Sequence, residues 1–232
     1  SSDVCSSDLA SGRGKARLAA DRIGAALVGG GCAVERISLP SLDGQPGRLQ
    51  QGFAAIVAVG GDGTVRSVAA RLAGTGVPLG IVPAGTENLA ARALGFTRPV
   101  AELGPAMADA IIAARTRRID LGWVEPAGGA RVSFVVMASA GFDADVVAAL
   151  AARRRGAISH ASYVAPILRT AVAWRAPGIR CAEDPAGLLS GPGCLVAANA
   201  PAYALGLDPA RDAIPTRSEE HTSELQSRQY LV

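Results

Sequence analysis

Short apolar runs alternate with glycine-rich turns and helical stripes in the first half of the chain. Residues 53–59 (FAAIVAV) and 79–82 (LGIV) are continuous apolar runs, typical of strands that are buried on both faces of a parallel sheet. Each run leads into a glycine-containing turn and then a stretch of helical periodicity, over 65–72 and 88–94 respectively. Residues 13–28 and 102–115 are further helical stripes, and residues 32–39 are expected to form a further strand. This order predicts a doubly wound α/β domain over about residues 10–118.

The pattern changes near residue 119. Strands are expected over 118–124, 131–138, 179–183 and 194–198, and helices over about 144–152 and 159–174. Turns rich in proline and glycine separate the strands. The sequence therefore predicts a second, β-rich domain over 119–216, with a helical insertion.

The two ends of the chain differ from the rest. Residues 1–9 (SSDVCSSDL) and 217–232 (RSEEHTSELQSRQYLV) are polar and show no sustained helical or strand period. Both resemble peptides that arise when sequencing adaptors are translated. We expect them to be foreign tails that carry no function, so that the natural protein extends past both ends and the second domain is incomplete.

The composition excludes several classes of function. The net charge of +3 is only mildly basic, well below the charge density of a dedicated nucleic-acid binder, so no nucleic-acid partner is expected. Lys15 is the only lysine and lacks the spacing of a P-loop, which excludes P-loop and protein-kinase chemistry. The four cysteines form no Cys-x-x-Cys pair, as expected for a reduced cytoplasmic protein without zinc.

The strongest motif follows the first buried strand. It consists of five consecutive residues: Gly60, Gly61, Asp62, Gly63 and Thr64. Glycines allow a sharp turn and a close approach of a ligand, and backbone N–H groups with the following helix N-terminus form an anion site. Asp62 fits such a loop if it holds Mg²⁺ or a substrate hydroxyl. A strand–turn–helix elbow without a ligand is the alternative.

A second polar loop follows the next strand, where Gly85, Thr86 and Asn88 lie in Pro-Ala-Gly-Thr-Glu-Asn. Because open α/β sheets bind ligands at the carboxyl ends of their strands, both loops are predicted to line one site. Helix capping is the alternative role of Thr86 and Asn88. A third segment, Ser11-Gly12-Arg13-Gly14, opens a predicted helix and suits a phosphate cradle, although it also suits a linker.

These segments resemble the diacylglycerol kinase catalytic domain, which bacterial lipid kinases share with sphingosine and ceramide kinases. Residues 60–64 match the GGDGT signature in full, 83–88 match PxGTxN, and 11–14 resemble the end of an Asn-Pro-x-Ser-Gly loop. Residues 141–144 and 156–163 are similar to the turn and the Gly…Tyr stretch of the second domain. The resemblance covers about residues 10–216.

The resemblance implies an ATP- and Mg²⁺-dependent lipid kinase that phosphorylates diacylglycerol or a related lipid. It implies that residues 11–14 and 60–64 bind ATP together with Gly85, Thr86 and Asn88, and that Mg²⁺ lies at Asp62. The family's general base is expected beyond Thr216 and has no match here; Asp208 and Asp212 lie nearby but do not fit the motif.

Peripheral contact with the inner face of the membrane is expected, and Arg153-Arg154-Arg155 could meet anionic headgroups, although such a run is usually only solvated. A homodimer is a further expectation, since a sheet that lacks its first strand exposes an edge that invites association.

Two alternatives stay open. An NAD kinase or another small-molecule kinase with a GGDGT loop is the first, and transfer to NAD would support it. A non-catalytic protein that binds a nucleotide or a lipid is the second, and nucleotide binding without transfer would support it.

Overall fold

The computed structural model of the chain has an α/β fold, as the sequence predicts. The structure describes residues 3–6, 14–45, 47–50, 52–125, 128–152, 170, 172, 174–175, 178–179, 191–201, 212–216 and 227–231. Two compact units are present: residues 1–136 with 199–232 form the first unit, and residues 137–198 form the second. The predicted change at residue 119 therefore lies within the first unit.

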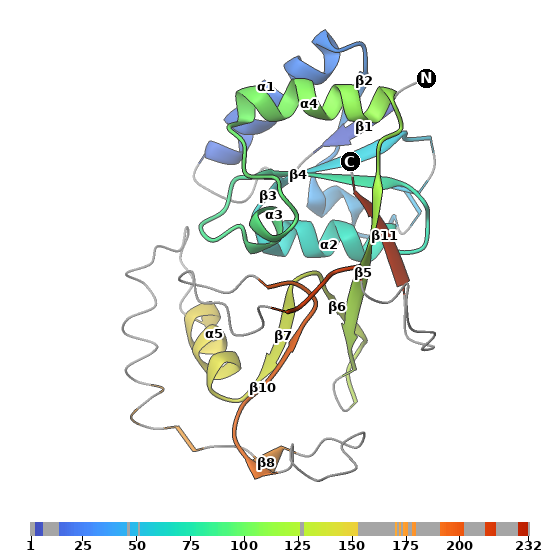
Figure 1. Ribbon diagram of the computed structural model, residues 1–232. Helices are drawn as coiled ribbons and strands as arrows, with labels where there is room; N and C mark the ends of the chain where they lie inside the picture. Colours follow the sequence, from blue (N-terminus) through green and yellow to red (C-terminus); the bar gives the residue numbers. More distant parts are fainter. Residues whose placement is uncertain are drawn as a thin grey trace. The chain divides into compact units, whose positions relative to one another are not determined.

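The first unit is built on a seven-stranded sheet. Its strands are β1 (Asp3–Ser6), β2 (Ala33–Arg36), β3 (Ala55–Gly60), β4 (Pro78–Pro83), β5 (Arg117–Val124), β6 (Val132–Phe134) and β11 (Ser227–Leu231). They lie in the order β2-β1-β3-β4-β11-β5-β6 (Figure 1). β1 to β4 are parallel, and β5 and β6 pair antiparallel. Gly60 lies opposite Pro83, so the two glycine loops leave the sheet at the same edge.

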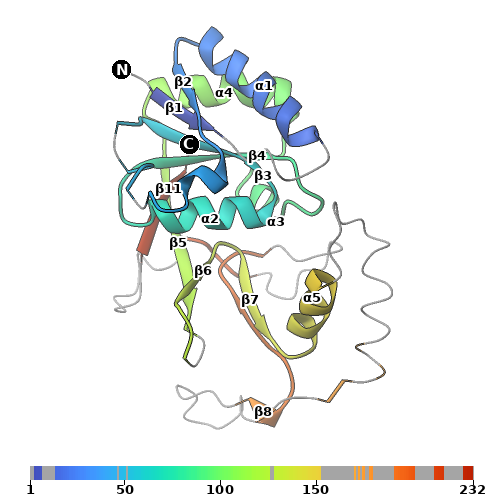
Figure 2. The same cartoon turned by 180° about the vertical axis from the view of Figure 1, so that it is seen from behind.

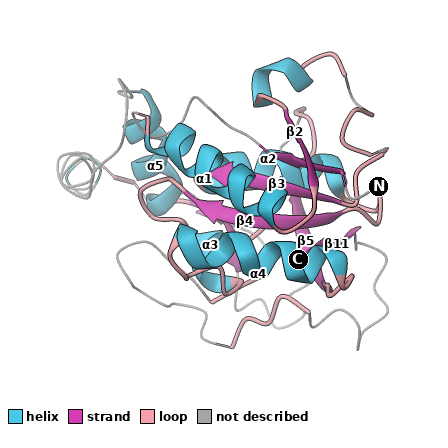
Figure 3. Ribbon diagram, turned by 90° about the horizontal axis from the view of Figure 1, so that it is seen from above, coloured by secondary structure: helices cyan, strands magenta, loops and turns pink. Residues whose placement is uncertain are grey.

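Helices cover both faces of the parallel strands. They are α1 (Lys15–Gly29), α2 (Asp62–Leu72), α3 (Leu89–Ala93) and α4 (Val100–Ile112). α1 and α4 lie on one face, and α2 and α3 lie on the other (Figures 1 and 2). Every residue of β3 is buried, as its continuous apolar run predicts. The doubly wound arrangement is visible from above in Figure 3, where helices flank the central strands.

Small residues let α1 and α4 pack closely. A Cβ atom added to Gly104 would collide with the Cβ atom of Ala26, and one added to Gly30 would collide with that of Ala108. Because both pairs advance by four residues, the two helices run side by side in the same direction. This packing fixes the position of α1, whose first turn borders the candidate site.

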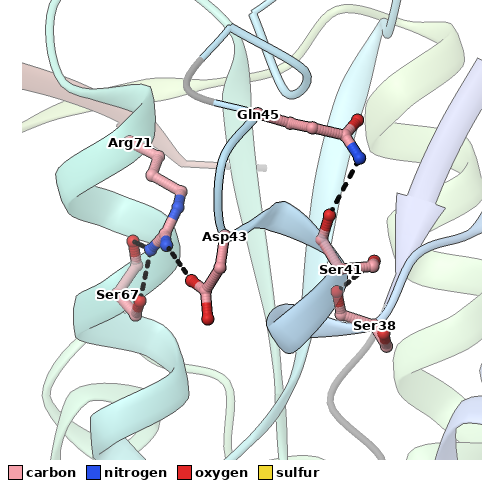
Figure 4. Close-up of polar contacts among 6 residues, drawn as sticks. All are labelled: Ser38, Ser41, Asp43, Gln45, Ser67 and Arg71. Atoms are coloured by element: carbon pink, nitrogen blue, oxygen red, sulfur yellow. Dashed lines mark hydrogen bonds and ion pairs between the residues drawn. The ribbon is translucent and has the colours of Figure 1, made fainter.

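The connection between β2 and β3 differs from the prediction. The strand expected over 32–39 ends at Arg36, and Leu39–Leu42 form a 3₁₀ helix with Pro40 in its first turn. Arg71 on α2 holds this connection: its guanidinium donates to the Ser67 carbonyl (3.1 Å) and forms an ion pair with Asp43 (3.3 Å; Figure 4). The connection is thereby tied to the end of α2 that lies away from the glycine loops.

The strand predicted over 131–138 is two strands, β6 and β7 (Met137–Ala140). The break at Val135 and Val136 has a clear cause. The Asn199 side chain donates to the carbonyl of Val135 (2.9 Å), and its backbone N–H donates to the carbonyl of Val136 (2.7 Å). These carbonyls therefore bind a distant segment of the chain instead of a neighbouring strand.

The second unit contains an antiparallel pair and one helix. β7 pairs with β10 (Leu195–Ala198), β8 (Gly178–Ile179) pairs with β9 (Gly191–Pro192), and α5 spans Phe142–Ala152. The predicted helix near 144–152 and the strand near 194–198 are therefore present, whereas most of the helix predicted over 159–174 lies outside the described residues.

Both tails that we expected to be foreign contribute strands to the sheet. β1 lies between β2 and β3, and β11 lies between β4 and β5. The position of the first strand, which we expected to be missing, is therefore filled, and the argument for association through an open edge there does not apply to this structure. Among the described residues, no helix is long and apolar enough to cross a membrane.

Candidate functional site

The first glycine loop connects β3 directly to α2. Gly61 occupies the N-cap position of α2, and its carbonyl accepts the first helical hydrogen bond, from the N–H of Val65 (3.1 Å). A Cβ atom at Gly60 would lie 2.5 Å from Thr64 Oγ1, so only glycine fits there. The helix begins at Asp62, three residues earlier than the periodicity predicts, because the signature itself forms its first turn.

The second glycine loop is closed by its own asparagine. Asn88 adopts a left-handed conformation (φ 50°, ψ 46°) immediately before α3. Its Oδ1 accepts a hydrogen bond from the N–H of Gly85 (2.8 Å), and its Nδ2 donates to the carbonyl of Gly85 (3.0 Å). Both functional groups of one carboxamide are thus bound to one residue, which sets the shape of the turn over 85–88.

The two loops touch through their backbones. A Cβ atom at Gly85 would lie only 2.6 Å from the Cα atom of Gly61, and the N–H of Ala84 donates to the carbonyl of Gly60 (2.9 Å). One side chain also joins the loops, because Oδ1 of Asp62 accepts a hydrogen bond from the N–H of Ala90 in α3 (2.8 Å). The sequence expectation that the loops share one sheet edge agrees with this geometry.

The remaining signature residues differ in their surroundings. Thr64 is the third residue of α2, and its side chain is only 5% exposed. Thr86 is exposed at the tip of the second loop. Gly63 is exposed, and among the described residues nothing beyond its own helix backbone and chain neighbours lies within 4 Å of the place its Cβ would occupy. Since Gly63 is helical rather than left-handed, neither packing nor backbone conformation requires glycine at this position.

A cavity of about 270 Å³ borders the second loop. Pro83, Ala84 and Gly85 form one side together with Val100, and α1 supplies the other side through Lys15, Leu18, Ala19 and Arg22. In the sequence, Lys15 serves only to exclude a P-loop, and Arg22 belongs to none of the motifs. The spacing 15, 18, 19, 22 places all four residues on one face of a helix, and this signal could have revealed the two cations.

The third predicted segment is described only in part. Gly14 occupies the N-cap position of α1 with a left-handed backbone (φ 86°), which explains the glycine, while Ser11, Gly12 and Arg13 lie outside the described residues. The stretches 153–155 and 156–163 and Asp208 also lie outside them, and Asp212 is exposed.

The residues present suit a cation that is shared with a ligand. Among the residues that the structure describes, no three His, Cys, Asp or Glu side chains gather to hold a metal ion. Mg²⁺ commonly uses one or two carboxylates and takes its other ligands from substrate phosphates and water. Asp62 can serve as that carboxylate, because a carboxylate that accepts one hydrogen bond retains further acceptor capacity.

Comparison with known proteins points to one family. The profile of the diacylglycerol kinase catalytic domain matches residues 46–124. A "Diacylglycerol kinase" from Mycobacterium tuberculosis is 39% identical over 95 residues, which make up 41% of this chain and 30% of that protein. A "Probable lipid kinase YegS-like" protein from Pseudomonas aeruginosa is 41% identical over 118 residues, or 50% of this chain and 36% of that protein. The matched stretches thus span about a third of these relatives.

A solved structure supports the fold independently. The structure of a candidate diacylglycerol kinase from Bacillus anthracis str. Sterne superimposes with a TM-score of 0.62 and 17% identity, covering 91% of this chain and 72% of that one. At this identity the likeness concerns the fold alone. Both glycine loops lie inside the stretch that the profile matches. Residues 46–124 of this chain therefore match the diacylglycerol kinase catalytic domain, the family that the motifs of the sequence resemble.

Proposed function

We propose that this chain is the nucleotide-binding part of an ATP- and Mg²⁺-dependent lipid kinase. The observation that carries the proposal is the backbone contact of Gly61 with Gly85 at one sheet edge, beside a cavity that Lys15 and Arg22 line. Glycine loops, a helix N-terminus and two cations together suit a polyphosphate. The family of residues 46–124 supports a kinase that acts on a lipid.

In this proposal the chain's own groups bind and orient the triphosphate. Lys15 is the first residue of α1, and Arg22 lies two turns further along it; both line the cavity, where they would offset phosphate charge. The N-terminus of α2 and the backbone of the second loop would fix the position of the phosphoryl groups. Mg²⁺, held by Asp62 and phosphate oxygens, would neutralise negative charge during transfer.

The proposed reaction transfers the γ-phosphoryl group to a lipid hydroxyl. The hydroxyl oxygen bonds to the γ-phosphorus, the bridging bond to ADP breaks, and the hydroxyl proton passes to a carboxylate base. Diacylglycerol or a related lipid is the proposed acceptor, reached by peripheral contact with the cytoplasmic face of the membrane. In this proposal the described residues bind the nucleotide, and none of them is assigned as the carboxylate base.

The test is phosphoryl transfer from γ-labelled ATP, in parallel assays with diacylglycerol micelles, a sphingoid base, ceramide and NAD. The assays use this chain and a version with the ends that the source DNA encodes. Labelled lipid would support the proposal and identify the acceptor. Labelled NAD would replace it by the small-molecule kinase alternative, and tight ATP binding without transfer to any acceptor would favour a binding protein.

A further inference from the structure

The second glycine loop is held by Asn88, a non-glycine residue with a left-handed backbone conformation. Asn88 and Ala114 are the non-glycine residues with a positive φ in the described part of the chain, and only Asn88 lies next to the candidate site. A left-handed conformation is unfavourable for most L-residues, but an asparagine can offset it by local hydrogen bonds. Both polar atoms of the Asn88 carboxamide make such bonds, to the two backbone groups of Gly85.

This pairing bears directly on the contact between the loops. Gly85 is the residue that meets Gly61: the place of its Cβ lies 2.6 Å from Gly61 Cα and 3.0 Å from Asn88 Oδ1. The position of Gly85 is therefore set from two sides, by the first loop and by the carboxamide. Thr86, which is exposed, lies within the turn that the carboxamide closes.

We propose that Asn88 is a positioning residue of the nucleotide site, whose carboxamide holds Gly85 against Gly61 and thereby fixes the second loop for a nucleoside triphosphate. The inference rests on the proposed function, and it gives Asn88 an indirect role in place of the direct nucleotide contact that the sequence analysis expected. Asp62 assists from the other loop, because its Oδ1 holds the N–H of Ala90, two residues after Asn88. The loop is then ordered before the nucleotide binds, so binding does not carry the free-energy cost of ordering it.

The central experiment compares Asn88→Gly with Asn88→Asp in the full chain. Asn88→Gly accepts the left-handed backbone and removes both hydrogen bonds, so the amide of Gly85 should lose protection from hydrogen exchange. Asn88→Asp retains an oxygen that accepts from this amide, so protection should remain. ATP affinity, measured by calorimetry, should fall by about tenfold in Asn88→Gly, since a small misplacement of a binding loop has effects of this order or larger. In an active version, the KM for ATP should rise more than kcat falls.

Thr75→Ala is the matched control. Thr75 also donates one hydrogen bond, to the Leu72 carbonyl (2.8 Å), and accepts one, from the N–H of Val77 (3.2 Å), but its turn precedes β4 and lies away from the loops. This variant should lower the melting temperature and leave ATP affinity unchanged.

The outcomes separate the two proposals. An unchanged exchange rate at Gly85 in Asn88→Gly, or lost protection with wild-type ATP affinity, would overturn the positioning role. Failure of the unaltered chain to bind ATP would instead overturn the nucleotide site. Equal losses of ATP affinity in Thr75→Ala and Asn88→Gly would assign the effect to general instability and also overturn the inference.

Discussion

The two glycine loops lie against each other, yet different forces hold them. The first, Gly60–Thr64, is fixed by close packing at Gly60 and Gly61 and continues into the 11-residue helix α2. The second is fixed by a side chain, Asn88, and continues into a helix of only 5 residues. The first loop is therefore a rigid part of the core, whereas the second depends on two hydrogen bonds and on its contact with the first.

This difference predicts where substitutions act. A change in the first loop should alter chemistry or packing while the second loop keeps its shape. A change in the second loop should alter ATP affinity first. The substitutions below test this division, beginning with the largest expected effect.

Asp62→Asn should reduce phosphoryl transfer by at least about 100-fold, because loss of one stabilising charge at a transferring group costs about 10²–10³-fold. The fold should be retained, since an amide oxygen can still accept the hydrogen bond from Ala90. Transfer from γ-labelled ATP and protection of the Ala90 amide would be measured together. Asp62→Ala should lose both the activity and the protection.

The control for this change is Asp43→Asn, which removes a carboxylate from an ion pair that is mostly exposed to solvent. Transfer should be unaffected by it. Near-normal turnover of Asp62→Asn would refute the role of Asp62 in the proposed reaction and leave it only the structural contact with Ala90.

Gly85→Ala should disturb both loops, because the new Cβ would lie 2.6 Å from the backbone of Gly61 and neither backbone can move freely. Overpacking of this kind costs about 1–3 kcal/mol of unfolding free energy, and ATP binding should weaken with it. Chemical denaturation and calorimetry would measure the two effects.

Gly63→Ala is a useful comparison, because no described residue outside its own helix lies near its Cβ position. Its stability should equal or exceed that of the unaltered chain, since alanine is favoured over glycine within helices. A loss of ATP affinity without a loss of stability would show that a ligand approaches Gly63. Full ATP affinity in this variant would instead place the phosphates away from the first loop.

Sequence patterns predict the strands and loops that form this site better than they predict the contacts between its residues. The apolar runs that became β3 and β4 indicated two buried parallel strands, and the turns after them indicated loops at one edge. Nothing in the spacing could predict that Asp62 would bind the N–H of Ala90, because this contact depends on the distance between two neighbouring strands. Lys15 and Arg22 were missed for another reason. Their spacing indicates that they share one face of a helix, but it does not indicate that this face lies opposite the second glycine loop.

Elsewhere, tertiary contacts override local patterns. Asn199 interrupts the strand predicted over 131–138 from more than sixty residues away, by bonding to the carbonyls of Val135 and Val136. The polar tails show no strand period, yet β1 and β11 each pair with a strand on both sides. Pairing of a short strand inside a sheet depends on its neighbours as well as on its own sequence.

The smallest predicted effect comes from Ala114→Gly, which tests whether Asn88 differs from an ordinary left-handed residue. Ala114 (φ 49°) follows α4, where the N–H of Arg115 donates to the Ala110 carbonyl (2.8 Å) in a helix-ending motif that usually contains glycine. Relief of the left-handed strain is worth about 1–2 kcal/mol, and the greater freedom of glycine in the unfolded chain removes about 0.4–1 kcal/mol.

Ala114→Gly should therefore gain between about 0 and 1.6 kcal/mol, and a gain of about 1 kcal/mol raises the melting temperature by about 2–4 °C for a chain of this size. Asn88→Gly relieves a similar backbone strain but loses two hydrogen bonds, each worth about 0.5–1.5 kcal/mol, so it should gain nothing. Thermal melts of the two variants, side by side, measure this difference. An equal rise in both would mean that the carboxamide of Asn88 adds no stability to its loop, and the second loop would then be held by its contact with Gly61 alone.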